Sequence, residues 1–382
     1  MYPHRREEHD AGSRVSGDES RKTRQTGGPH QGNPRTVEWA EHPLRLPRPG
    51  LLRTLTVLSL ISAAAACLDT AGDDVGTTSS ATFAVMTTTT TSSDTTTSTV
   101  EPTTTTSAFD ELAAGAVITP SGVVVAILDR GNTGFIVRTP CDNKATVGNG
   151  EPVGPVAVVL DPGHGGPVDS GAVGANGLRE ADVNLATALA TERLLVQRGI
   201  SVILTRTADY AVRIGVRSQL ADDLGAEMLV SIHHNAPTPG PSTTPGTEIF
   251  IQSGSERSRR LGGLIWEHVV TALSGIQDVD WSAAPDSGVL VVLNTRGEDA
   301  YGMTRLPETV AVLAELAYIS SPSEAEMLAT SQYIDTASDA LADAIETYLE
   351  KNDLGGGYVD EPRVFNPLPG ISADVCEDPD LG

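Results

Sequence analysis

One histidine in a glycine-rich turn is the first candidate for chemistry in this chain. His164 lies in Asp161-Pro162-Gly163-His164-Gly165-Gly166, directly after the apolar run 156–160. Glycines on both sides allow a tight turn and leave space for a ligand beside the imidazole. A turn of this kind at the end of a strand is a common place for a metal-binding histidine. Alone it is a weak signal, because most lone histidines in such turns are surface residues.

Two further segments supply residues that would complete a metal site. Glu180 opens an amphipathic segment, and His233 and His234 end a second apolar run. Two histidines and one glutamate are the ligands of a catalytic zinc site with one open coordination position. Adjacent strand residues point to opposite faces, so only one of the two neighbouring histidines can join the site. For Glu180 the alternative is structural, since a carboxylate at a helix start stabilises the helix dipole.

One acidic residue is difficult to explain by packing. Glu315 lies in the otherwise apolar run 310–318. A buried carboxylate costs several kcal/mol unless a cation lies beside it. A metal ion would supply that cation, and the alternative is a salt bridge with Arg206 or Arg305.

Strands and helices alternate from residue 156 to about residue 350. Strands are expected at 156–160, 201–205, 227–232, 247–251, 288–293 and 309–316, and helices at 180–198, 213–224, 256–273 and 335–348. This order predicts an α/β fold, a mainly parallel twisted sheet with helices on both faces. His164, His233 and Glu315 all lie at or near the carboxyl ends of expected strands, where sites on such sheets are found.

The segments on either side of this main domain are smaller. Residues 109–155 contain two strand-like runs, 122–128 and 134–138, with turn residues between them. We therefore expect a small β-hairpin region that packs on the main domain. Residues 351–382 are acidic and rich in Gly and Pro, which predicts an extended surface tail.

The first 108 residues are too polar or too low in complexity to bury a core. Residues 1–53 form a polar extension that becomes basic, and the true start could lie downstream, near Val37. Residues 54–67 are a short apolar stretch ending in Ala-Ala-Ala-Cys, typical of an export signal and too short for a stable membrane-spanning helix. This ending resembles a bacterial lipoprotein cleavage site, so Cys67 is the expected lipidation site, with plain secretion or an uncleaved anchor as alternatives. The Thr/Ser-rich residues 68–108 are expected to be a disordered linker.

The net charge limits the possible partners, and the cysteine content indicates the compartment. The net charge is −24, and the part of the chain after Arg53 carries −27. Such an acidic body repels nucleic acid and anionic lipid, so we expect no nucleic-acid partner and a membrane contact only through a lipid or signal anchor. If Cys67 carries lipid, Cys141 and Cys376 remain as one pair, which predicts a disulfide in an oxidising compartment. Two free thiols are the alternative.

The motifs together resemble the zinc-dependent N-acetylmuramoyl-L-alanine amidases, bacterial enzymes that cut the stem peptides of peptidoglycan from the glycan. The matching segments run in family order across 156–349, about half of the chain: 160–166, 169–172, 176–180 with Asn184-Leu185, 204–207, Arg217, 231–236 and 313–320. The resemblance implies that His164, Glu180 and His233 bind one zinc ion. It also implies that Glu315 is the catalytic glutamate, which takes a proton from the attacking water and returns it to the leaving L-alanine amine.

The resemblance adds three smaller expectations. Arg206 and Asn235 are candidate substrate-binding residues, which would orient substrate or the metal ligands. The family usually has Gly-Phe where this chain has Ala317-Tyr318, a change that we expect to be conservative. The segment 237–245 is short and Pro-rich, without room for the inhibitory helix of some relatives, which predicts an open groove.

The prediction is therefore an exported monomeric amidase of the cell envelope, lipid-anchored or else secreted, with peptidoglycan as its partner. A zinc peptidase on stem peptides and a non-catalytic wall-binding protein are the rival functions, and residues 109–155 could themselves be a small wall-binding module. A dinucleotide-binding interpretation of the glycine turn fails. The turn lacks the third glycine of that fingerprint, and Pro167 interrupts the expected helix start.

Overall fold

The computed structural model describes residues 114–236, 246–276 and 287–382. The expectations for the extension 1–53, the export signal with Cys67, the linker 68–108 and the segment 237–245 fall outside these residues. Within the described ranges, no helix has both the length and the apolar character that crossing a membrane requires.

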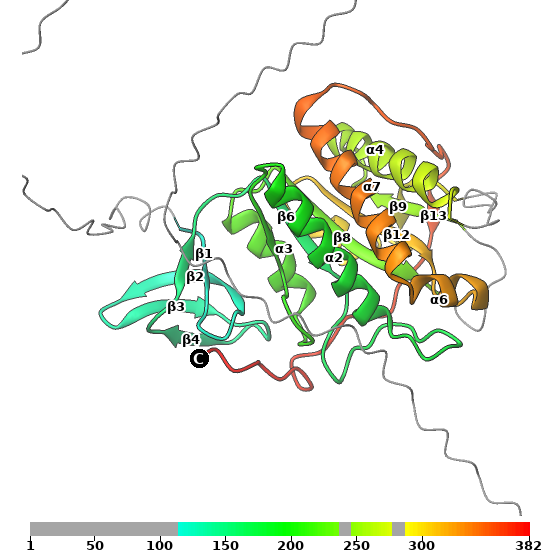
Figure 1. The fold of residues 1–382 in the computed structure, drawn as a ribbon. Coiled ribbons are helices and arrows are strands. Elements are labelled where there is room, and N and C mark those ends of the chain that lie inside the picture. The colour runs from blue at the N-terminus through cyan, green and yellow to red at the C-terminus, as the bar shows by residue number, and fades with distance from the viewer. Residues whose placement is uncertain (1–113, 237–245, 277–286) are drawn as a thin grey trace, which may run out of the picture. The chain divides into compact units, whose positions relative to one another are not determined.

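A six-stranded sheet forms the centre of the main domain (Figure 1). Its strands, in spatial order, are β10 (Val289–Leu290), β9 (Glu248–Ile251), β12 (Ala311–Tyr318), β8 (Met228–Asn235), β6 (Val158–Pro162) and β7 (Val202–Leu204). The last four strands are mutually parallel, whereas β9 is antiparallel to β12 and parallel to β10. The predicted mainly parallel sheet is confirmed, with one antiparallel junction at β9.

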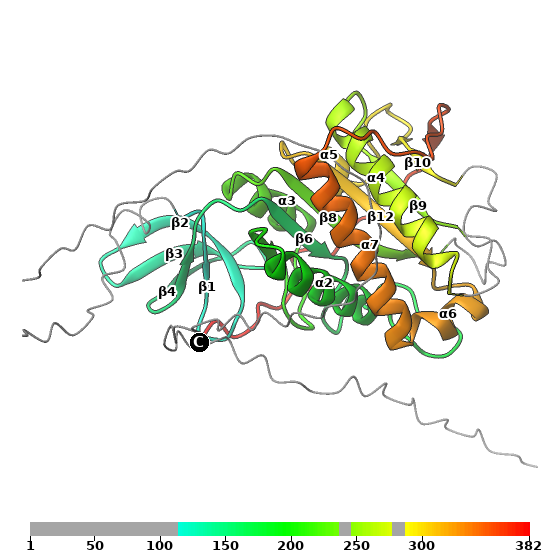
Figure 2. The same ribbon diagram turned by 45° about the horizontal axis from the view of Figure 1, so that its top comes forward.

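Helices cover both faces of this sheet. One face carries α2 (Glu180–Gln197), α7 (Ser331–Glu350) and α4 (Glu256–Leu273), with α7 between the other two, as Figures 1 and 2 show. The short helix α6 (Pro322–Leu328) precedes α7, and the opposite face carries α3 (Ile214–Asp223) and α5 (Gly302–Arg305). The four long helices match the predicted segments to within a few residues, whereas α5 and α6 are too short to show a helical period.

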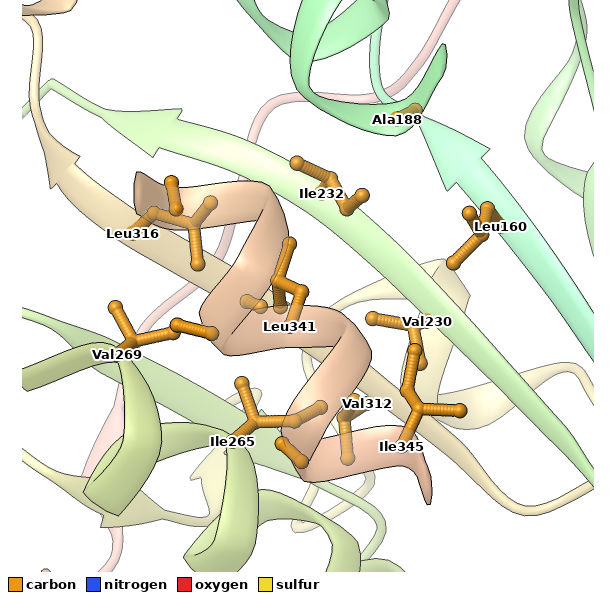
Figure 3. Close-up of a cluster of buried hydrophobic side chains, with 14 of the residues drawn as sticks. Leu160, Ala188, Val230, Ile232, Ile265, Val269, Val312, Leu316, Leu341 and Ile345 are labelled. Atoms are coloured by element: carbon orange, nitrogen blue, oxygen red, sulfur yellow. The ribbon is translucent and has the colours of Figure 1, made fainter. Parts of the chain in front are cut away.

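Successive residues of the strands point to opposite faces of the sheet and pack in two separate cores. Val230 and Ile232 of β8 face α7, where they meet Leu341 and Ile345 (Figure 3). Leu229, which precedes Val230, points to the other face of the sheet and packs in the second cluster with residues of α3 and α5. Both faces of the strands are therefore buried, which explains why these strands are continuously apolar in the sequence.

The region before the main domain is larger than the predicted hairpin. It is an antiparallel sheet of five strands in the order β4 (Lys144–Val147), β3 (Gly134–Arg138), β2 (Val124–Gly131), β1 (Ala116–Ile118) and β5 (Glu151–Val153). The hairpin of β2 and β3 is present, but the prediction missed three strands of three or four residues, which are too short for a clear alternation pattern. As expected, the region packs on the main domain: Val125 and Phe135 share a cluster with Val216 of α3.

The C-terminal tail, residues 351–382, returns from α7 along the edge of the main sheet. Its only described strand, β13 (Arg363–Val364), pairs in parallel with β11 (Val292–Leu293). Further on, Cys376 forms a disulfide with Cys141, with an S–S distance of 2.00 Å. The predicted disulfide is thus present in the structure, and it fixes the tail to the five-stranded sheet.

Candidate active site

The three predicted ligands come together at the carboxyl ends of β6 and β8 and the first residue of α2. One nitrogen or carboxylate oxygen from each of His164, Glu180 and His233 lies within 4.8 Å of the others. Oε1 of Glu180 is 3.2 Å from Nε2 of His164 and 2.9 Å from Nδ1 of His233. Two imidazole nitrogens and one carboxylate oxygen converge on one point, which is the donor set that suits zinc.

The orientation of His164 is set by a second carboxylate. His164 has a left-handed backbone, with φ at 60°, and its Nδ1 lies 2.6 Å from Oδ1 of Asp169. A carboxylate on one ring nitrogen turns the other nitrogen toward the metal position and raises its basicity. Asp169 was not predicted as a site residue, although it lies in one of the family-like segments.

Arg206 holds the metal-binding turn from behind. Its side chain is fully buried, with 0% of the residue exposed. Its guanidinium donates to the carbonyl oxygens of Pro162 at 2.9 Å, Gly163 at 2.9 Å and Ala181 at 2.7 Å. The prediction that Arg206 binds substrate is therefore wrong, since a guanidinium enclosed by carbonyls cannot reach a polymer. The alternative, that it orients the metal ligands, agrees with its contacts to the ligand-bearing backbone.

Arg217 fixes the same turn from the side of α3. It donates to the carbonyl of His164 at 2.7 Å and to Oδ1 of Asp161 at 2.7 Å. Burial alone would raise the pKa of Asp161, but Arg217 and the hydroxyls of Ser231 and Thr205 hold it below its usual value. The aspartate that opens the motif is thus a charged structural residue and not a ligand.

Two glycines leave the space that the ligands occupy. A Cβ at Gly163 would lie 2.2 Å from the His233 ring. A Cβ at Gly171 would lie 2.6 Å from Oε2 of Glu180 and 2.7 Å from Cδ2 of His164, and Gly171 has a φ of 64° that favours glycine. The motif needs these glycines because side chains of the site pack directly on the backbone.

We expect Gly163→Ala to lose metal affinity and activity together, because the new methyl group overlaps the His233 imidazole. The matched control is Gly215→Ala in α3, where an added Cβ meets nothing within 4 Å. In a helix this control change should stabilise the fold by about 0.5–1 kcal/mol. Zinc titration and thermal unfolding of both variants check the prediction. Unchanged zinc affinity in Gly163→Ala would contradict the placement of His233.

The electrostatics of the pocket favour a bound cation. Burial alone would lower the pKa of His164, but Glu180 and Asp169 raise it to about 10. Burial likewise opposes the charge on Glu180, yet His164 and His233 hold its pKa well below the usual range. Glu180 therefore keeps its negative charge although it is buried, and this charge would attract a divalent ion.

His234 points away from the site, as strand alternation predicts. It is 0% exposed, and its Nδ1 lies 2.7 Å from Oδ1 of Asn184 while its Nε2 lies 2.7 Å from the Tyr333 hydroxyl. Burial lowers its pKa to about 3, so the ring is neutral at physiological pH. Asn184 also donates to the carbonyl of Gly163 at 3.2 Å. The second histidine thus supports the turn from the opposite face of β8.

Glu315 lies beside the cluster on β12, directly opposite His233 on β8. It is 7% exposed, and its Oε2 has no hydrogen-bond partner among the described residues. Burial, together with the charges of Glu180 and Glu248, raises its pKa well above the usual range. A buried carboxyl group with an unpaired oxygen next to a metal-binding cluster is suited to proton transfer.

The salt-bridge alternative for Glu315 fails for both arginines considered. Arg206 donates to the backbone carbonyls described above. Arg305 donates to the carbonyl oxygens of Asp299 and Ala300. A cation at the His-Glu-His cluster remains the explanation for a carboxylate at this position.

Glu248 is a buried acid that the sequence interpretation missed. It lies opposite Glu315 on the antiparallel neighbour β9, and its side chain is 1% exposed. Oε2 of Glu248 accepts from Asn235 Nδ2 at 2.8 Å and from the Tyr318 hydroxyl at 2.8 Å. Asn235 is thus placed beside the site through Glu248, and its contact with substrate stays a prediction. The change from Phe to Tyr318 is also more than conservative, because the added hydroxyl binds Glu248.

The fold and the site together define a hydrolase with a mainly parallel α/β domain. The profile of the N-acetylmuramoyl-L-alanine amidase family matches residues 158–347. The chain belongs to this family, and the match spans the three residues of the cluster and Glu315.

Three relatives illustrate the range of similarity. The uncharacterized protein YqiI of Bacillus subtilis (strain 168) is 34% identical over 218 residues, which are 56% of this chain and 93% of the relative. The sporulation-specific N-acetylmuramoyl-L-alanine amidase of the same organism is 30% identical and covers 53% of this chain and 72% of the relative. The amidase AmiA of Escherichia coli (strain K12) is 29% identical over a region that covers 50% of this chain and 75% of AmiA.

Proposed function

We propose that this protein is a zinc-dependent amidase that hydrolyses the amide between the lactyl group of N-acetylmuramic acid and L-alanine in peptidoglycan. The observation that carries the proposal is the convergence of His164, Glu180 and His233 beside the buried Glu315. The family to which the chain belongs supports the choice of bond. The donor set and the two buried glutamates, Glu180 and Glu315, support the choice of zinc.

Each residue has a defined task in this reaction. Zinc, when bound, supplies a Lewis acid that polarises the carbonyl and lowers the pKa of water. Glu315 accepts the proton of the attacking water at its free oxygen and delivers it to the departing L-alanine amine. Its raised pKa favours the protonated form, which carries the proton from the water to the amine. Arg206, Arg217 and Asp169 keep the histidine turn in place during turnover.

We also propose that the protein works outside the cell membrane as a monomer, tethered by lipid on Cys67, with secretion as the alternative. The sequence 54–67 supports export, and the Thr/Ser-rich residues 68–108 would give the enzyme reach from its anchor. The mass of the mature N-terminus tests the tether. An unmodified Cys67 would exclude lipidation.

The test of the function uses the purified full-length chain on purified peptidoglycan, with and without a zinc chelator. We expect chelator-sensitive release of new alanine amino termini and no new reducing sugar. New amino termini from other stem residues would make the protein a peptidase instead. Co-sedimentation with the wall and no cleavage, under conditions where zinc is bound, would indicate a binding protein.

A further inference from the structure

We propose that the C-terminal tail is a functional part of the active site, and that Arg363 is a positioning residue acting on Glu315 through Glu248. The tail lies beyond the segment 158–347 that matches the family. The inference rests on the proposed function, because it concerns the geometry of the glutamate that transfers the proton.

The tail reaches the active site along a path that the backbone fixes. The Val289 amide donates to the carbonyl of Gly357 at 2.7 Å, and the Val359 amide donates back to Val289 at 2.9 Å. The amide of Phe365 then donates to Leu293 at 2.9 Å, so the tail continues as a strand beside β10 and β11. Arg363 therefore has a set register next to the main sheet.

Two glycines are required for this path. Gly355 and Gly357 have φ values of 73° and 76°. A Cβ at Gly355 would lie 2.2 Å from the backbone of Gly263 in α4, and one at Gly357 would lie 2.3 Å from the Trp266 ring. The tail thus runs in close contact with α4, and its approach to the site is built into the sequence.

Arg363 supplies the positive charge for Glu248. Its guanidinium donates to Oε1 of Glu248, while Asn235 and Tyr318 donate to Oε2. Both oxygens of Glu248 are therefore occupied, in a side chain that is 1% exposed. An arginine paired with a buried carboxylate offsets much of the cost of burying that charge. Without it, only the neutral donors Asn235 and Tyr318 would face the buried carboxyl group of Glu248.

The position of Glu248 connects this ion pair to catalysis. Glu248 and Glu315 are directly opposite on neighbouring antiparallel strands. When Glu315 is ionised, as it must be to accept the proton, like charges in that arrangement repel each other. Arg363 holds Glu248 by a charged hydrogen bond, so that Glu315 stays opposite His233 with its Oε2 left without a partner for the reacting water. Loss of the guanidinium would shift the two carboxylates apart.

The far end of the tail is anchored as well. Beyond the disulfide, the carboxylate of Asp378 accepts from the amide of Cys141 at 2.7 Å and from the side chains of Thr139 and Asn143 at 2.8 Å each. These contacts hold the tail to the five-stranded sheet. The segment that carries Arg363 is therefore tethered on both sides, which reduces its freedom to leave the site.

The experiment compares variants of the full-length enzyme by release of alanine amino termini. We expect Arg363→Met to lower kcat by about 100-fold, the cost of a displacement near 1 Å at a catalytic group. Zinc content and KM should stay near the wild-type values. Arg363→Lys should recover most of the loss, because it keeps the charge. The control is Arg259→Met, since Arg259 stacks on Tyr358 of the same tail at 4.0 Å but lies away from the site.

A double variant separates positioning from general loosening of the tail. With Glu248→Gln the charge that needs Arg363 is gone, so Glu248→Gln/Arg363→Met should have the kcat of Glu248→Gln alone. A full additional loss in the double variant, or a wild-type kcat in Arg363→Met, would overturn the proposal. If Arg363→Met does not fold, the double variant still decides between these outcomes. Failure of the wild-type enzyme to release alanine termini would instead count against the proposed function.

Discussion

Glu315→Gln is expected to bind zinc as the wild-type enzyme does and to lose about 100- to 10,000-fold in kcat. The amide has nearly the same shape as the carboxylate, so it fits the position opposite His233 on β8. It cannot accept the proton of the attacking water, and it has no proton of suitable acidity for the leaving amine. KM should change little, because the lost interaction belongs to the transition state.

Zinc content by mass spectrometry and steady-state kinetics on peptidoglycan test this prediction. The matched control is Glu324→Gln in α6. Glu324 is 0% exposed, and its Oε1 also lacks a hydrogen-bond partner among the described residues. Because that glutamate lies outside the cluster, its variant should keep the wild-type kcat. Equal losses in both variants would mean that buried glutamates matter here for folding and not for proton transfer.

His233→Ala should abolish zinc binding at micromolar concentrations and reduce activity to background. Loss of a supporting residue around a zinc site already costs 10–100-fold in affinity, and loss of a ligand should exceed about 100-fold. The remaining His164 and Glu180 would still lie 3.2 Å apart but would offer only two donor atoms. Added zinc should therefore not restore the rate.

The control for this variant is His268→Ala, since His268 lies in α4, outside the cluster. Zinc titration, circular dichroism and the alanine-release assay should show normal behaviour for His268→Ala. A His233→Ala enzyme that retains one zinc ion and wild-type kinetics would refute the assignment of this histidine as a ligand.

The sequence was sufficient for the parts of the site that depend on local pattern. His164 was visible because a glycine turn follows an apolar strand, and the choice between His233 and His234 followed from the two-residue period of β8. Glu315 was visible because a carboxylate interrupts an apolar strand. The structure places these residues together because β6, β8 and β12 are parallel, so their carboxyl ends meet at one edge.

The parts that were missed depend on long-range contacts. Glu248 is the first residue of β9 and precedes its apolar residues, so it does not interrupt an apolar run as Glu315 does. The antiparallel placement of β9 beside β12, which brings Glu248 opposite Glu315, was not predictable from that segment. Arg363 lies in a Gly- and Pro-rich tail that looks like a featureless surface segment. Its role depends on the path of the tail, which runs back past α4 to the main sheet. The strands β1, β4 and β5 were missed for a different reason, because three or four residues carry too little pattern.

The disulfide between Cys141 and Cys376 has a consequence for resistance to proteases. The two cysteines are 235 residues apart, and the main domain lies between them. A single backbone cleavage anywhere in that interval would leave both fragments covalently joined, with the rest of the sheet and the helices still holding them in place. A nicked enzyme would therefore remain one molecule until the disulfide is reduced.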